Sequence, residues 1–334
     1  MIARRTLLAG SLGGLLWPAA SRRLRAEAAL ESVTIAVSST SFVLAGVKIG
    51  QQAGLFARNG IDLRIVVMES GNAAMAALIG GSVPFAVTGP PDALMANARG
   101  QDIVIAANLY AGFAGSVVLA TSVAQKLGVP ATAPIKDRFH ALDGLLLAVP
   151  SATSVLLAPI KKAAEDNGAK VRFTYMAQGT MPAALEANAI QGMVASFPFA
   201  GTPVLRGAGV LWIDGPGGEL PADVAASSSS SIQTTGAYLK ANRNTVRKLQ
   251  QAIVAIADFV EKDQEHAKQA LAASYPDLSA QEIDLAFTRQ WRNWTKPFLT
   301  ESDIRQELKL LVSSTKPLAL IVSNRQAYSS ARNE

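Results

Sequence analysis

The sequence predicts an α/β protein of two lobes, in which each lobe is a mostly parallel sheet flanked by helices and further helices follow at the C-terminal end. Three observations predict this class. Short β-forming runs alternate with helical runs from residue 32 onward, as in parallel sheets with helices on both faces. The same order recurs in a second stretch that begins near residue 145. The chain has 334 residues, of which 49% are apolar, and this is enough for two separate cores.

The first set of elements is expected between residues 33 and 109. The β-rich runs predict strands over residues 33–38, 61–68, 84–88 and 103–109, and the segments between them predict helices over 42–59, from 72 and from 91. The helix over 42–59 is expected to end at Gly60, because glycine is common just after the last turn of a helix.

The second set repeats the first in order and in detail. Strands are expected over 145–149, 171–176, 192–196 and 210–213, with helices over 153–167, from 181 and from 198. Met68-x-x-Gly71 in the first set corresponds to Met176-x-x-Gly179 in the second. The repeat indicates two lobes of similar strand–helix–strand build.

The domain organisation follows from these two sets. Residues 1–28 are expected to be an export signal. Residues 29–115 together with 225–334 are expected to form a discontinuous first lobe, and residues 116–224 the second lobe. The long return of the chain to the first lobe places the C-terminal helices there.

The chain is expected to cross between the lobes twice, near 112–119, where a loop leads into a strand over 116–120, and again at 225–233. The second crossing contains five consecutive serines, which leaves a flexible linker and a polar strand as open alternatives. Helices should follow, since apolar residues recur at the helical period over 246–260. Two more are expected over 279–291 and 300–313, each opened by Ser or Thr with an acid close behind.

The first residues have the features of an export signal. Arg4 and Arg5 precede an apolar run over 7–20, which is too short to span a bilayer, and residues 26–28 (AEA) offer the small-x-small pattern of a cleavage site. The paired arginines are typical of twin-arginine export, and an ordinary secretory signal is the alternative. We expect a periplasmic protein with its signal cleaved near Ala28.

Composition excludes several classes of function. There is no Cys and there are two His, so a Cys nucleophile, a thiolate metal site and a multi-histidine metal site are not expected. No nucleophile elbow, phosphate loop, dinucleotide fingerprint or zinc-protease motif occurs, so we expect neither an enzyme nor a cofactor. The net charge of +6 falls to +2 outside residues 1–28, so no nucleic acid partner is expected.

Several motifs in order resemble one family. The run QAGLFARNGIDL over residues 52–63 is similar to the helix-to-strand signature of periplasmic solute-binding proteins of ABC importers of the nitrate/sulfonate/taurine type. Relatives in that group bind thiamine precursors and aromatic acids. Residues 70–72 (SGN) and 87–91 (VTGPP) fit the next motifs in order. The acidic residue that the family often has before Pro198 is replaced by Phe197.

The resemblance implies the two-lobed type II periplasmic binding protein fold, in which the lobes close over a small ligand by hinge motion. It also implies a permease and ATPase complex in the inner membrane as partner, and a monomer in solution. Ligands of open α/β sheets bind beyond the carboxyl ends of the strands, so the residues after each expected strand are the candidates.

The candidates carry hydroxyl groups, amides and glycines, with phenylalanines as a possible apolar wall. They are Ser39, Thr40, Ser41, Phe42, Ser70, Gly71, Asn72, Thr88, Gly89 and Phe113 in the first lobe, and Ser151, Thr153, Gln178, Thr180, Ser196 and Phe197 in the second. Such groups, with the free N–H groups of helix N-termini, can hold a sulfonate or carboxylate without a basic side chain. A helix cap for the hydroxyls and a core position for the phenylalanines are the alternatives.

The sequence therefore predicts the substrate-binding component of an ABC import system that captures a small organic anion, of the sulfonate or carboxylate class, between its two lobes. Two alternatives remain open. The first is a periplasmic sensor or scavenging module that passes its ligand to a receptor, and the second is a binder of a thiamine precursor.

Overall fold

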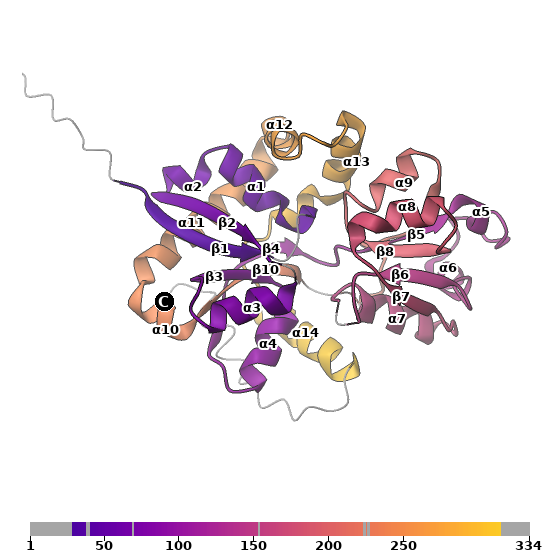
Figure 1. The fold of residues 1–334 in the computed structure, drawn as a ribbon, viewed down its shortest axis with the longest axis horizontal. Helices are drawn as coiled ribbons and strands as arrows, with labels where there is room; N and C mark the ends of the chain where they lie inside the picture. The colour runs from indigo at the N-terminus through magenta and orange to yellow at the C-terminus, as the bar shows by residue number, and fades with distance from the viewer. Residues whose placement is uncertain are drawn as a thin grey trace, which may run out of the picture.

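The computed structural model describes residues 29–37, 41–68, 70–152, 154–222, 225 and 228–314. The expected export signal lies outside the described residues, as do the candidate site residues Ser39, Thr40 and Thr153. Figure 1 shows two sheets side by side, each covered by helices. We call each sheet with its helices a lobe.

The first lobe is built on a five-stranded sheet with the order β2-β1-β3-β10-β4. The strands are β1 (Glu31–Val37), β2 (Ile61–Val67), β3 (Phe85–Thr88), β4 (Ile103–Ala111) and β10 (Ser228–Thr235). Strand β1 pairs in parallel with β2 and β3, whereas β10 is antiparallel to both of its neighbours. The sheet is therefore parallel apart from the one strand that comes from a distant part of the sequence.

The second lobe repeats this topology with the order β7-β6-β8-β5-β9. Its strands are β5 (Ser116–Ala120), β6 (Leu146–Val149), β7 (Arg172–Tyr175), β8 (Gly192–Ala195) and β9 (Gly209–Asp214). Strand β5 occupies the position of β10 and is likewise antiparallel to its neighbours. In each lobe the antiparallel strand is the one that follows a crossing. The predicted fold class, two mostly parallel sheets flanked by helices, is confirmed.

The helices of the first lobe are η1 (Phe42–Leu44), α1 (Ala45–Gln52), α2 (Leu55–Arg58), α3 (Gly71–Ile79) and α4 (Pro90–Ala98). The prediction of a single helix over 42–59 is wrong, because the segment forms three short helices, η1, α1 and α2. Gly54 separates α1 from α2 with a φ of 68°, a left-handed conformation that ends a helix.

The second lobe carries α5 (Thr121–Ala124), α6 (Ile135–His140), α7 (Leu157–Asp166), η2 (Gln178–Thr180), α8 (Met181–Glu186) and α9 (Gly201–Leu205). Helices α5 and α6 were not predicted. Helices α7 and α9 begin later than the expected starts at residues 153 and 198.

The C-terminal helices are α10 (Gly236–Ala241), α11 (Arg243–Lys262), α12 (Gln264–Ser274), α13 (Ala280–Gln290), η3 (Trp291–Trp294) and α14 (Glu301–Ser314). Helix α11 buries the face predicted from its periodicity against α1, α2 and β4. Helix α13 contacts α9 of the second lobe, where the Thr202 hydroxyl donates to Glu282 at 2.9 Å. These helices belong to the first lobe by sequence order but contact both.

The two crossings lie directly against each other. Gly215, which follows β9, packs so closely on the first crossing that a Cβ atom there would lie 1.9 Å from the carbonyl oxygen of Gly115. Ser229 joins the crossings as well, since its hydroxyl donates to Gly112 O and accepts from Ala114 N–H, both at 2.8 Å. The serine run thus enters a buried strand and, within the described residues 228–231, is not a flexible linker.

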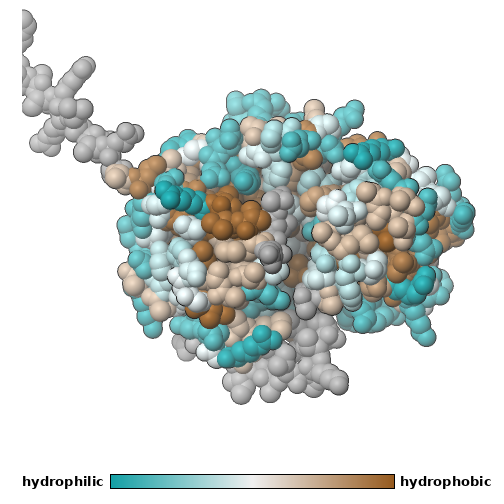
Figure 2. All heavy atoms as spheres, in the orientation of Figure 1, coloured by the Kyte–Doolittle hydropathy of each residue, from teal (hydrophilic) through white to brown (hydrophobic). Residues whose placement is uncertain are grey.

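The apolar core runs from one lobe into the other, because one cluster includes Ile35 and Leu249 of the first lobe and Met193 and Leu185 of the second. Figure 2 shows a surface on which polar and apolar side chains alternate, with a brown apolar area on the first lobe beside the gap between the lobes. No helix in the part of the chain described above is both long and apolar enough to cross a membrane.

Candidate ligand-binding site

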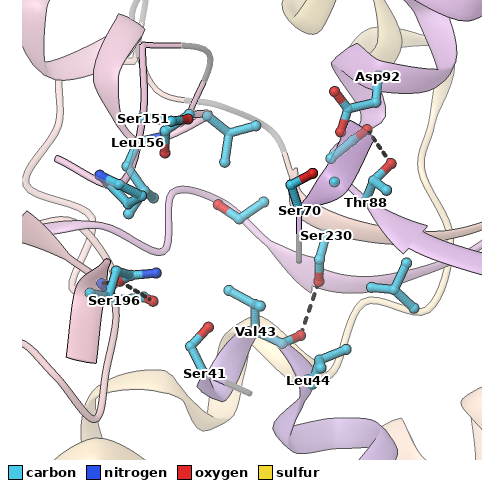
Figure 3. Close-up of a pocket in the computed structure, with 18 of the residues that line it drawn as sticks. Ser41, Val43, Leu44, Ser70, Thr88, Asp92, Ser151, Leu156, Ser196 and Ser230 are labelled. Carbon is cyan, nitrogen blue, oxygen red and sulfur yellow. Dashed lines mark hydrogen bonds between the residues drawn. The ribbon is translucent and has the colours of Figure 1, made fainter. Parts of the chain in front are cut away.

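A cavity of about 560 Å³ lies where the carboxyl ends of the parallel strands of both sheets face each other (Figure 3). Its lining residues lie at or shortly after the carboxyl ends of β1, β2, β3, β6, β7 and β8, or at the start of β10. They are Ser41, Val43, Leu44, Val67, Ser70, Gly71, Asn72, Val87, Thr88, Gly89, Asp92, Pro150, Ser151, Ser154, Val155, Leu156, Ala177, Gln178, Gly179, Ser196, Phe199, Ser229 and Ser230. Both lobes contribute, so a ligand here would touch each of them.

The structure brings nine of the sequence-based candidates together at this cavity. They are Ser41, Ser70, Gly71, Asn72, Thr88, Gly89, Ser151, Gln178 and Ser196. The rule that placed them, ligand sites beyond the carboxyl ends of strands, needs only the strand positions. Their contact with a ligand stays a prediction.

Four other candidates do not line the cavity. Phe42, Phe113 and Phe197 are at most 2% exposed and lie in the core. The backbone N–H of Phe42 donates to the carbonyl oxygen of Phe197 at 2.9 Å, so these two join the lobes beneath the cavity rather than wall it. Thr180 is exposed, and its hydroxyl donates to Ala177 O at 2.8 Å. The aromatic side chain that does line the cavity is Phe199.

Gln178 presents hydrogen-bond donors on the second lobe. The backbone N–H and the hydroxyl of Ser196 both donate to Gln178 Oε1, at 2.7 and 2.9 Å. A backbone N–H can only donate, so the atom that it meets must be the amide oxygen. The Nε2 group is therefore the free end of this amide, and its two N–H donors are available to an acceptor in the cavity.

A buried glutamine forms hydrogen bonds with Thr88 and Gly89. Gln233, on β10, is fully buried; its Oε1 accepts from the Thr88 hydroxyl at 2.8 Å and its Nε2 donates to Gly89 O at 3.0 Å. Nε2 also lies 3.2 Å from Ser231 Oγ. Because a threonine hydroxyl has one proton, Thr88 faces the cavity mainly as an acceptor.

Two serines of β10 form hydrogen bonds beneath the cavity. The Ser230 hydroxyl donates to Val43 O at 3.0 Å, and the Ser228 hydroxyl donates to Asn108 at 2.6 Å (Figure 3 shows the Ser230 bond). Both serines are at most 2% exposed. Their hydroxyls thus fix neighbouring segments, as buried polar groups must have partners.

Asp92 is a charged residue of the lining that the sequence reasoning did not select. It lies in the first turn of α4, where Pro90 and Pro91 occupy the first two positions and supply no N–H. Among the described residues that line the cavity there is no Lys, Arg or His. Burial is the largest influence on this carboxyl and raises the pKa of Asp92; Thr88 and the Gly89 backbone N–H oppose that rise.

The raised pKa of Asp92 predicts a pH-dependent stability. As pH rises above the ordinary pKa of Asp, near 3.9, the unfolded chain gives up this proton before the folded chain does, so folding becomes less favourable. Asp92→Asn removes that loss. We expect the melting temperature of Asp92→Asn minus that of the wild type to become more positive between pH 4 and pH 8, measured by calorimetry. A difference that stays constant with pH, or one that an exposed control such as Asp62→Asn reproduces, would contradict this.

Sequence reasoning missed further residues besides Asp92. Ser229, Ser230 and Gln233 belong to β10, whose start was left open between linker and strand. Asp92 lies four residues after Thr88, one turn beyond the strand end, and including the first helical turn after each strand would have found it. Among the described residues, no group of three or more His, Cys, Asp or Glu could hold a metal ion.

A sequence model of the NMT1-like family matches residues 28–274, about three quarters of the chain. The chain belongs to the NMT1-like family. No curated protein matches it at a significant level. The family assignment covers both sheets and every strand described above.

Solved structures share the fold over most of their length. A protein from Bordetella bronchiseptica RB50 matches with a TM-score of 0.73 at 19% identity, over 89% of this chain and 94% of that chain. The periplasmic aliphatic sulphonate binding protein SsuA from Escherichia coli matches with 0.64 at 18%, over 84% and 91%. The periplasmic nitrate-binding protein NrtA from Synechocystis PCC 6803 matches with 0.61 at 13%, over 89% and 89%.

These comparisons confirm the resemblance that the motifs indicated. The NMT1-like chain has the fold of periplasmic binding proteins of the sulfonate and nitrate type. The two neighbours with named ligands are binding proteins, in agreement with the expectation of a binding protein rather than an enzyme.

Proposed function

We propose that this NMT1-like chain is the substrate-binding component of an ABC import system and captures a small organic solute between its two lobes. The observation that carries the proposal is the cavity itself, which the strand ends of two similar sheets form together. Both sheets bring hydrogen-bonding groups to it, such as Thr88 and Gln178. A binding site shared by two lobes lets the ligand control whether the lobes close.

The size and lining of the cavity fit an organic solute better than a bare inorganic ion. A volume of about 560 Å³ lies within the usual range of small-molecule sites, roughly 300–1,000 Å³. Val43, Leu44, Val155, Leu156 and Phe199 offer apolar surface for a carbon skeleton. A sulfonate or carboxylate end would accept hydrogen bonds from the Gln178 amide, whose oxygen is already occupied by Ser196.

Closure of the lobes would occur about the two crossings. At Gly89 the first lobe already lies close to the second, since a Cβ atom there would be 2.9 Å from Val155 Cγ1. In this proposal residues 29–115 with 225–334 form one rigid body and residues 116–224 the other. The ligand ties them together through contacts on both sides of the cavity.

The export signal would place the protein in the periplasm as a monomer, where it delivers its ligand to a permease and ATPase in the inner membrane. Loss of uptake of the identified compound in cells that lack this chain would support transport. Normal uptake together with a lost transcriptional response would instead favour the sensing alternative.

A ligand screen with one variant tests the proposal. Calorimetric melting should show stabilisation by an organic sulfonate, an aromatic or aliphatic carboxylate or a thiamine precursor, about 2.7 kcal/mol at a ligand concentration of 100 Kd. Gln178→Leu should weaken the best ligand about tenfold or more, because the cavity loses the amide donors. The control is Gln101→Leu, at an exposed site away from the cavity. Equal affinity of Gln178→Leu and wild type would show that the ligand binds elsewhere.

A further inference from the structure

We propose that Asp92 binds a protonated amine or another N–H-bearing nitrogen of the ligand, so that the solute is an amino-bearing organic acid rather than a simple organic anion. This inference rests on the proposed function and specifies the ligand class of the same cavity. Its basis is the distribution of charge and of hydrogen-bond donors within the lining.

Asp92 brings a carboxylate to the cavity wall. It lines the cavity together with Thr88 and Gly71, and its Oδ2 lies 3.5 Å from the position that a Cβ atom on Gly71 would take. Figure 3 shows its carboxyl group beside Thr88 at the cavity. The carboxylate thus stands next to the N-terminus of α3, where a simple anionic ligand would otherwise find a partial positive charge.

No cation in the lining compensates this charge. The described lining residues include no Lys, Arg or His, and the internal stretches outside the described residues (38–40, 69, 153, 223–224 and 226–227) contain none in their sequence. A second anion placed here would meet a carboxylate without a counter-ion. A ligand ammonium would instead supply the missing partner, and buried charges are stable when paired.

The protein's own donors satisfy the Asp92 carboxylate only in part. The Thr88 hydroxyl lies 2.8 Å from Gln233 Oε1, and its single proton cannot serve both this oxygen and Asp92. Pro90 and Pro91 remove two N–H groups from the start of α4. Burial raises the pKa of Asp92, and the Gly89 N–H offsets this effect only in part.

The wall of the cavity that the second lobe forms presents hydrogen-bond donors, which complement the Asp92 carboxylate. Gln178 Oε1 is occupied by the N–H and hydroxyl of Ser196, so the amide turns donors toward the cavity. An acceptor stands on the first lobe and donors stand on the second. A ligand with an amine at one end and a carboxylate or sulfonate at the other satisfies both walls and draws the lobes together.

Matched pairs of probes test this inference on the full mature chain. The pairs are 2-aminoethanesulfonate with ethanesulfonate, 4-aminobutanoate with butanoate, and 4-(aminomethyl)benzoate with 4-methylbenzoate, titrated calorimetrically at pH 7.5. We expect the aminated member of at least one pair to bind tenfold or more tightly than its partner. Asp92→Asn should remove this preference, whereas the control Asp62→Asn, on the exposed part of β2, should keep it.

The pH dependence of the wild type gives a second readout that needs no variant. Asp92 is the titratable group of the described lining, so affinity for an aminated probe should fall as pH drops and the carboxylate becomes protonated. A simple anion would bind more tightly under the same change, and Asp92→Asn would strengthen it.

Equal or tighter binding of the non-aminated probes, with affinity rising at low pH, would overturn the inference and leave the proposed function standing. Failure of all probes to bind, together with failure of the broader screen, would overturn the proposed function and the inference with it.

Discussion

Gly215→Ala is expected to lower the free energy of unfolding by about 3 kcal/mol, one of the larger effects that a single methyl group can have in this chain. A Cβ atom at Gly215 would lie 1.9 Å from Gly115 O and 2.6 Å from the Phe113 ring. The nearest of these is backbone, so no side-chain rotation relieves the overlap and the segment after β9 must move away from the first crossing. Equilibrium unfolding in urea measures the loss.

Gly46→Ala is the matched control for this prediction. Gly46 is also buried, but its Cβ atom would make ordinary contacts of 3.8 Å with Ile256 and 3.9 Å with Trp294. It lies in α1, where alanine is the better helix former, so Gly46→Ala should be neutral or stabilising by up to about 1 kcal/mol. Similar stabilities of the two variants would mean that Gly215 is not packed on the first crossing as described.

Gln233→Leu is expected to cost about 2–4 kcal/mol although leucine has nearly the same volume. The change removes the Gln233 partner of the Thr88 hydroxyl and of Gly89 O at a buried position, and each hydrogen bond lost there without an equal replacement costs about 1–3 kcal/mol. It should also weaken ligand binding, because Thr88 and Gly89 line the cavity. Urea unfolding and ligand titration of the same preparations separate the two effects.

A double-mutant cycle shows whether the network acts as a unit. Thr88→Val removes the hydroxyl that donates to Gln233 Oε1. Gln233→Leu should therefore lower the free energy of unfolding less in the Thr88→Val background than in the wild type, and we expect a coupling energy of about 1 kcal/mol. Strictly additive effects would show that the bond between these two side chains contributes no stability.

The fold could be predicted from sequence because its strands are short β-rich runs separated by clear turns. Every strand of both sheets lies within a residue or two of its expected position, except β10, whose start was left open between linker and strand. Periodicity also gave the buried face of α11. The predicted helix starts at residues 153 and 198 were wrong, because α7 begins at Leu157 and α9 at Gly201. Helix starts depend on local capping and on tertiary contacts, which a run of apolar residues does not specify.

The site could be predicted as far as the strand ends determine it. Ser70, Thr88 and Gln178 line the cavity because they lie at or after strand ends, and the ends of these strands can be predicted from the sequence. Phe42 and Phe197 also follow strands, but their large apolar side chains gain more by burial in the core than at a polar cavity. The role of Gln233 could not be predicted, because it depends on the pairing of β10 with β3 across a sequence separation of 145 residues.

The placement of β10 has a consequence for the order in which the chain folds as it leaves the ribosome. All five strands of the second sheet come from the continuous stretch 116–214, so that sheet can assemble as soon as this stretch has emerged. In the first sheet β3 and β4 are joined only through β10, which is made more than a hundred residues after them. Until residues 228–235 have been synthesised, β4 therefore has no neighbouring strand with which to pair in this sheet. We therefore expect the middle of the sequence, residues 116–214, to form the first finished sheet, and the sheet whose strands begin the chain to be completed last.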